Sequence, residues 1–134
     1  MIVADSNLIA YLLIPGDKSD ICDEVFLKDP DWAVPLLCRS EFRNILTLYM
    51  RHEQMSLNQA LATMEKADRL WRDHEYSVPS NAVLELTHKH NISAYDGEFV
   101  VLAQELGTPL ITFDNAVKRM FPKIATDPTE YLKQ

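Results

Sequence analysis

Short apolar runs that alternate with segments of helical periodicity constrain the fold of this sequence most strongly. The runs at 2–5 (IVAD), 32–35 (WAVP) and 109–112 (PLIT) predict buried strands, and residues 76–78 and 123–126 predict two shorter ones. The segments between them predict helices at 7–13, 19–28, 36–52, 56–74, 80–90, 94–106 and 115–120. Strands separated by helices form a parallel sheet with helices on both faces. We therefore predict an α/β fold, a three-layer sandwich with a central parallel sheet flanked by helices.

Serine and glycine residues mark several predicted helix ends. Ser19, Ser56 and Ser80 are predicted N-caps, because a serine hydroxyl accepts a hydrogen bond from the first helical turn. Gly107 is predicted to end the helix at 94–106. The helix at 56–74 is predicted to bury one apolar face, formed by Leu57, Ala60, Leu61, Met64, Ala67 and Trp71.

Length and composition predict a single soluble domain spanning residues 1–134. The chain has 47% hydrophobic and 25% charged residues, which is typical of globular proteins. It has no apolar run near the roughly 20 residues of a membrane span and no signal-peptide pattern, so we expect a cytoplasmic protein without membrane association. Cys22 and Cys38 are isolated from each other, which favours reduced core cysteines over a disulfide framework or a zinc site.

The charge balance is acidic. Thirteen Lys and Arg residues against twenty Asp and Glu residues give a formal charge of −7. Proteins that bind long stretches of nucleic acid usually carry a basic surface. Any nucleic-acid contact of this chain is therefore expected to be local, metal-mediated or assisted by a partner.

Four acidic residues stand at positions where a cation site could form. Asp5 and Asp114 follow predicted strands, and ligands of parallel sheets bind at the carboxyl ends of the strands. Glu41 and Asp96 lie on predicted helices. A structural role alone could also explain each residue: N-capping for Asp5 and Asp114, the helix dipole for Asp96, and a surface position for Glu41.

Three stretches of the sequence resemble the PIN domain family and, within it, the VapC-like toxin ribonucleases. They are IVADSNLIA at the start, SEFRNIL in the long predicted helix, and AYDGEFVVLAQELGTPLITFD at 94–114. The resemblance runs from residue 2 to about residue 126. It implies a PIN-like α/β fold and a divalent-metal-dependent endoribonuclease of RNA.

The resemblance also implies roles for individual residues. Asp5, Glu41, Asp96 and Asp114 would be catalytic, with Asp5, Asp96 and Asp114 binding Mg²⁺ or Mn²⁺. A metal-bound water would attack the phosphodiester and leave a 5′-phosphate and a 3′-hydroxyl. Hydroxyl groups beside the first and last acids would orient those acids; they belong to Ser6 and Thr112.

Further expectations concern RNA and protein partners. Basic residues near the acids are candidate contacts to RNA phosphates, namely Arg39, Arg43, Lys118 and Arg119. The family resemblance implies the toxin of a type II toxin–antitoxin pair, bound by a small antitoxin. It also implies a homodimer, because the helices carrying Tyr49, Met50, Met55 and Met64 pair subunits in this family.

Three other functions compete with the toxin hypothesis. A stand-alone RNA-processing PIN nuclease would need no antitoxin, and a catalytically silent PIN-like binding module would bind no metal. A receiver-type phosphoacceptor module is disfavoured, because the chain lacks an Asp after WAVP and a Lys after PLIT.

Overall fold

The computed structural model describes residues 1–134 and centres on a five-stranded parallel sheet. The strands are β1 (Ile2–Ala4), β2 (Trp32–Pro35), β3 (Glu75–Tyr76), β4 (Leu110–Ile111) and β5 (Ala125–Thr126). They pair in the order β3-β2-β1-β4-β5. This arrangement confirms the predicted α/β fold with a parallel sheet.

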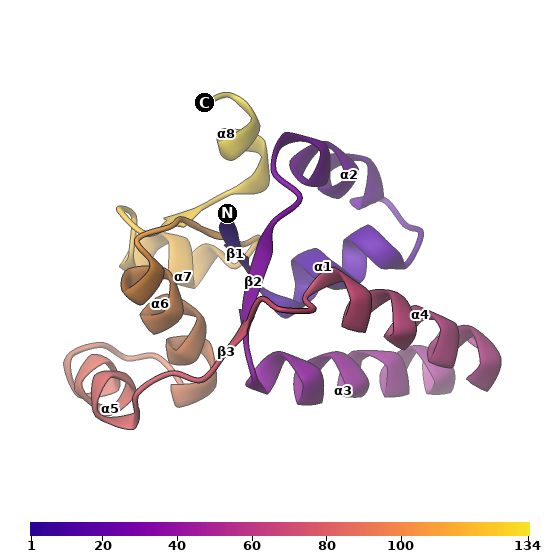
Figure 1. Cartoon of the computed structure of the whole chain (residues 1–134), viewed down its shortest axis with the longest axis horizontal. Coiled ribbons are helices and arrows are strands. Elements are labelled where there is room, and N and C mark those ends of the chain that lie inside the picture. The colour runs from indigo at the N-terminus through magenta and orange to yellow at the C-terminus, as the bar shows by residue number, and fades with distance from the viewer.

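Helices cover both faces of the sheet. They are α1 (Ser6–Leu13), α2 (Ser19–Lys28), α3 (Leu37–His52), α4 (Leu57–Leu70), α5 (Ser80–Lys89), α6 (Ala94–Leu106), α7 (Asn115–Met120) and α8 (Pro128–Leu132). Figure 1 shows α1 to α4 on one side of the sheet and α5 to α7 on the other, with α8 against α2. The short helix α8 was not predicted, although Asp127 caps it and Pro128 occupies its first turn. No helix of the chain is long and apolar enough to cross a membrane.

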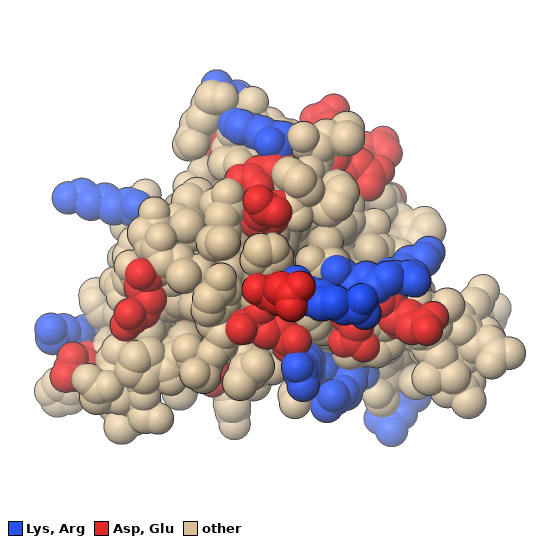
Figure 2. All heavy atoms as spheres, in the orientation of Figure 1, with Lys and Arg blue, Asp and Glu red and all other residues tan.

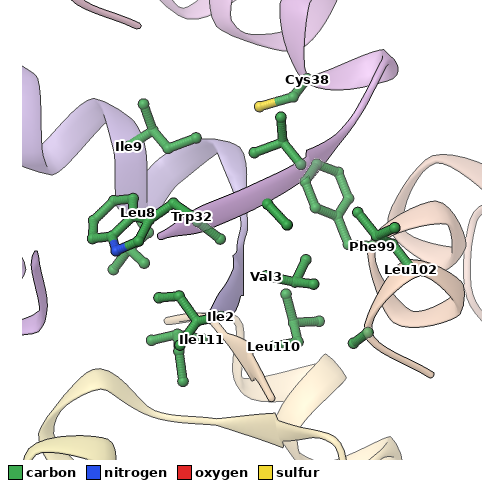
Figure 3. Close-up of a cluster of buried hydrophobic side chains, with 14 of the residues drawn as sticks. Ile2, Val3, Leu8, Ile9, Trp32, Cys38, Phe99, Leu102, Leu110 and Ile111 are labelled. Atoms are coloured by element: carbon green, nitrogen blue, oxygen red, sulfur yellow. The ribbon is translucent and has the colours of Figure 1, made fainter. Parts of the chain in front are cut away.

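The central strand β1 is anchored on both faces. Its three residues are buried because it has a strand on each edge and a helical layer on each side. In Figure 3, Leu8, Ile9 and Trp32 lie on one side of this strand, and Phe99 and Leu102 of α6 lie on the other. Burial of each large apolar side chain contributes about 1.5–3 kcal/mol, so the position of the strand end is firmly fixed.

Two of the four predicted helix boundaries form as expected. Ser56 and Gln59 form a reciprocal capping box at the start of α4, and Gly107 ends α6 in the left-handed conformation, with φ of 62°. Ser19 and Ser80 are instead the first residues of their helices, so the N-cap predictions there are wrong. The Ser19 hydroxyl accepts from the Gly16 N–H and donates to the Ile14 carbonyl, which holds the preceding turn.

The buried face of α4 differs from the predicted one. Ala60, Ala67 and Trp71 are buried as predicted, but Leu57 and Leu61 are 62% and 57% exposed. A rotation of 100° per residue places Leu61 about 120° from Ala67, outside the contact stripe. Helix α4 therefore presents two leucines to solvent. Cys22 and Cys38 are buried free thiols, as predicted.

Candidate active site

A pocket of about 250 Å³ opens at the carboxyl edge of the sheet. All four predicted acidic residues line it: Asp5, Glu41, Asp96 and Asp114. Ser6, Asn7, Asn44 and Thr112 add hydroxyl and amide groups, and the rest of the wall is apolar. No Lys, Arg or His side chain belongs to the wall, so the pocket is strongly acidic.

Pairing of β1 with β4 brings Asp5 and Asp114 to the same edge of the sheet. Ala4 is in register with Ile111, and each acid follows its strand closely. Asp5 Oδ1 accepts from the Leu8 N–H at 2.8 Å, and Asp114 Oδ1 accepts from a helix α7 N–H at 2.9 Å. Both acids thus have the N-capping role considered above, and both also face the pocket.

The two hydroxyl groups contact different acids from those expected. Thr112 donates its hydroxyl proton to Asp5 Oδ2 and accepts the backbone N–H of Asp114 at 3.0 Å. Ser6 Oγ donates to Glu41 Oε1 at 2.7 Å. Each hydroxyl therefore orients the carboxylate of another segment, rather than the acid beside it in the sequence.

Helices α3 and α6 supply the other two carboxylates. Glu41 is half-buried on α3, one turn before Asn44 on the same face. Asp96 lies in the first turn of α6, where the helix dipole favours a negative charge, and its side chain is exposed at the pocket rim. The backbone N–H of Asp96 donates to Ser93 Oγ, which caps the helix.

Burial and mutual repulsion disfavour the charged forms of three of these acids. Desolvation raises the pKa of Asp5, and Asp114 raises it further, while hydrogen bonds from Thr112 and Leu8 oppose this rise. The pKa of Glu41 is raised by desolvation and by the carboxylates of Asp96 and Asp5. The pKa of Asp96 is raised by desolvation and by Asp114. None of the four acids forms an ion pair within the chain.

The donor set of the pocket fits a hard divalent cation. Mg²⁺ binds oxygen ligands and usually retains several waters while using one or two carboxylates directly. Four carboxylates without a protein counter-charge provide such oxygens. No three Asp, Glu, His or Cys side chains of the chain form a preformed cage.

Comparison with known proteins assigns the family. A family model described as the PIN domain matches residues 2–121. The chain belongs to the PIN domain family. This assignment confirms the resemblance found in the sequence, and it covers all four acids of the pocket.

Individual PIN-domain relatives agree with this assignment. The chain is 25% identical over 131 residues to Ribonuclease VapC3 of Pyrobaculum aerophilum, covering 93% of this chain and 98% of that protein. The crystal structure of PAE2754 from the same organism matches with a TM-score of 0.76 at 17% identity, covering 98% of this chain and 86% of that one. FitAcB from Neisseria gonorrhoeae matches with a TM-score of 0.70 at 18% identity, over 96% and 99% of the chains.

A fourth relative is a toxin–antitoxin complex from Klebsiella pneumoniae, with a TM-score of 0.68 at 16% identity, covering 96% of this chain and 98% of that one. These solved structures share the fold of the present chain. The predicted class, a VapC-like nuclease, agrees with the name of Ribonuclease VapC3.

The four basic residues proposed to contact RNA lie outside the pocket wall. Arg39 forms a two-pronged ion pair with Glu75, and Lys118 pairs with Asp127 at 2.6 Å. Arg43 shares a mixed-charge hollow with Arg39, and Figure 2 shows the crowding of acidic and basic side chains around β3 and the nearby ends of α3 and α4. Their contact with RNA remains a prediction.

Sequence reasoning missed the two amides of the pocket. Asn44 lies three residues after Glu41, so helical spacing could have placed it on the same face. Asn7 follows Ser6 directly at the start of α1.

Proposed function

We propose that this PIN domain is a divalent-metal-dependent endoribonuclease that hydrolyses RNA phosphodiester bonds. One observation carries the proposal: four carboxylates from four separate segments line one pocket that contains no protein cation. Gathering acids in one pocket without a positively charged partner is unfavourable, and binding sites commonly contain such arrangements. Mg²⁺ or Mn²⁺ would relieve this repulsion and would also attract a phosphate.

Asp5, Asp96 and Asp114 are the residues proposed to hold the ion, with Glu41 completing the catalytic set. The ion would supply a bound water of lowered pKa and would stabilise charge on the leaving oxygen. Thr112 keeps the Asp5 carboxylate aimed at the pocket, and Ser6 does the same for Glu41. With its raised pKa, Glu41 is suited to accept a proton from the attacking group.

The same protein is proposed to be the toxin of a type II toxin–antitoxin pair in the cytoplasm. Solved relatives include a toxin–antitoxin complex and FitAB bound to a DNA fragment. A basic side chain of an antitoxin could form ion pairs with the four carboxylates of the pocket, because no Lys or Arg of this chain lines it. The antitoxin would also supply positive charge that this chain lacks.

A homodimer is the proposed assembly. Tyr49, Met50, Met55 and Met64 on and between α3 and α4 are only partly buried, and they adjoin the exposed Leu48, Leu57 and Leu61. A second copy would cover this apolar surface. Sedimentation of the purified chain would test the assembly independently of catalysis.

Calorimetric titration with Mn²⁺ tests the metal site directly. The wild-type protein should bind the ion, Asp96→Asn should bind it at least tenfold more weakly, and Glu105→Gln on the same helix should behave as wild type. Cleavage of single-stranded RNA in Mg²⁺ should be lost in Asp96→Asn and retained in Glu105→Gln. Unchanged cleavage in Asp96→Asn would refute the catalytic assignment.

Controls on the wild-type protein separate the other functions. Absence of Mn²⁺ binding would favour a silent binding module. Cleavage without growth arrest on expression, and without a co-purifying partner, would favour a stand-alone RNA-processing enzyme.

A further inference from the structure

Lys18 lies over two aromatic rings beside the acidic pocket. Its Nζ is 4.9 Å from the centroid of the Tyr11 ring and 4.7 Å from that of Phe113. The two rings contact each other edge to face, with their centroids 5.5 Å apart. Lys18 is exposed and forms no ion pair within the chain, whereas both rings are half-buried. The aromatic pair therefore holds the ammonium group at a defined place while leaving it open to solvent.

This cluster of Lys18, Tyr11 and Phe113 adjoins the pocket through the backbone. Phe113 lies between Thr112 and Asp114, which both line the pocket. Tyr11 follows the pocket residue Asn7 by one turn of α1, so the two share a helix face. Lys18 is therefore held against the two segments that carry Asn7, Thr112 and Asp114, although it is not itself a residue of the pocket wall.

A polyanionic substrate needs such a cation. The chain carries a formal charge of −7, and the pocket concentrates four carboxylates. A bound metal ion would compensate charge only at the phosphate in the pocket, while the neighbouring phosphates of RNA would still be repelled. An ammonium group held at the rim would meet a neighbouring phosphate.

The other lysine stacked on an aromatic ring in this protein serves a different purpose. Lys28 Nζ lies 4.2 Å from the centroid of the Tyr131 ring, but it also donates hydrogen bonds to the carbonyls of Tyr131 and Gln134. Its donors are used to hold the C-terminus. Lys18 has no such bonds, so its donors remain available to a ligand.

We propose that Lys18, positioned by Tyr11 and Phe113, binds an RNA phosphate adjacent to the phosphate that enters the acidic pocket. This inference rests on the proposed ribonuclease function and adds a phosphate-binding residue to it. Tyr11 and Phe113 act as positioning residues. An acidic segment of a protein partner could use the same ammonium group, and the experiment below distinguishes the two ligands.

RNA binding can be measured without cleavage, by fluorescence anisotropy of a labelled single-stranded oligonucleotide in EDTA across a salt series. Lys18→Met should weaken binding by roughly fivefold, similarly for all sequences, and should reduce the slope of log K against log salt by about 0.7. Lys28→Met, which removes the same charge elsewhere, should match the wild type. Tyr11→Phe keeps the ring and should also match it, whereas Tyr11→Leu should weaken binding in the same direction as Lys18→Met.

Several outcomes would overturn the inference. The first is that the wild type does not bind RNA. The second is that Lys18→Met and Lys28→Met have equal affinities and equal salt slopes. The third is that Lys18→Met binds RNA as the wild type does but no longer retains a co-expressed antitoxin. The last outcome would assign the cluster to a protein partner. A failure of the metal mechanism would be distinguishable from these outcomes. Asp96→Asn would then cleave RNA as the wild type does, while Lys18→Met would still bind RNA more weakly than the wild type.

Discussion

The Thr112 hydroxyl donates a hydrogen bond to the Asp5 carboxylate, although 107 residues separate the two in the sequence. This bond joins the end of β4 to the end of β1. Burial raises the pKa of Asp5, and the hydrogen bond from Thr112 opposes that rise. The same hydroxyl accepts the backbone N–H of Asp114. Thr112 thus connects two acids of the pocket without itself offering a charge.

Thr112→Val should impair the pocket more than it impairs the fold. Valine keeps the shape of the side chain but removes the donor, so the pKa of Asp5 should rise further and the acidic limb of the pH–activity profile should move to higher pH. Mn²⁺ affinity and cleavage rate should fall by roughly 10- to 100-fold. Thr112→Ser, which restores the hydroxyl, should recover most of both, and equal loss in the two variants would contradict this role.

Glu41→Gln should stabilise the metal-free protein while abolishing cleavage. The pKa of Glu41 is raised in the folded state, so its charge opposes folding at neutral pH. Glutamine keeps an oxygen for the Ser6 hydrogen bond and has a similar helix propensity. Thermal unfolding in EDTA should therefore give a higher Tm for Glu41→Gln than for the wild type.

The stabilisation by Glu41→Gln should depend on pH with a definite sign. The stabilisation should be complete above the raised folded-state pKa of Glu41. It should disappear as pH falls toward the ordinary value of 4.5, because folded wild-type Glu41 takes up its proton over this range and then no longer carries a charge. Glu65→Gln on α4 is the matched control, since this glutamate is exposed, and its Tm should equal that of wild type. Stabilisation that persists unchanged in acid would contradict the electrostatic explanation.

Mn²⁺ binding should release protons and weaken as the pH falls. Asp5, Glu41 and Asp96 all have raised pKa values, and metal ligands must be deprotonated. Affinity should therefore begin to fall at a pH above the ordinary titration range of Asp and Glu. Calorimetry in buffers of different ionisation enthalpy measures the protons released, and binding that is independent of both buffer and pH would contradict the prediction.

Gly97→Ala should stabilise the protein by about 1 kcal/mol, the usual difference between Gly and Ala inside a helix. A Cβ atom there would make ordinary contacts, at 3.5 Å from Thr87 and 3.6 Å from Leu86. Gly107→Ala should have the opposite effect, because Gly107 has a φ of 62° at the end of α6. Thermal unfolding of both variants would test the pair, and a loss of stability in Gly97→Ala would show that α5 and α6 cannot accommodate the methyl group.

Sequence reasoning located the four acids because each has a local signature. Asp5 and Asp114 follow apolar runs, Asp96 lies in a first helical turn, and Glu41 is the one acidic residue of its helix. The hydroxyl partners were assigned to the wrong acids. The Thr112–Asp5 bond depends on the pairing of β1 with β4, and the Ser6–Glu41 bond depends on the packing of α1 against α3. Local sequence does not specify which strands are neighbours.

Other errors also arose from packing. Leu57 and Leu61 have the spacing of a buried face, but the contact of α4 with its neighbours follows Ala60 and Ala67. Ser19 and Ser80 were predicted to be N-caps, but each is the first residue of its helix. The residues that occupy the N-cap positions are Lys18 and Pro79. Helix α8 is too short to give a periodic signal, and it is held against α2 by tertiary contact.

The central place of β1 affects when the protein becomes active during its synthesis. Strand β1 and Asp5 are made before the neighbouring strand β4, and Thr112 follows Asp5 by 107 residues in the chain. A nascent chain that lacks them also lacks four of the twelve residues that line the pocket, including Asp114. Translation must therefore pass beyond Thr112 and Asp114 before the pocket is whole and the protein can act on the RNA around it, including the message that encodes it.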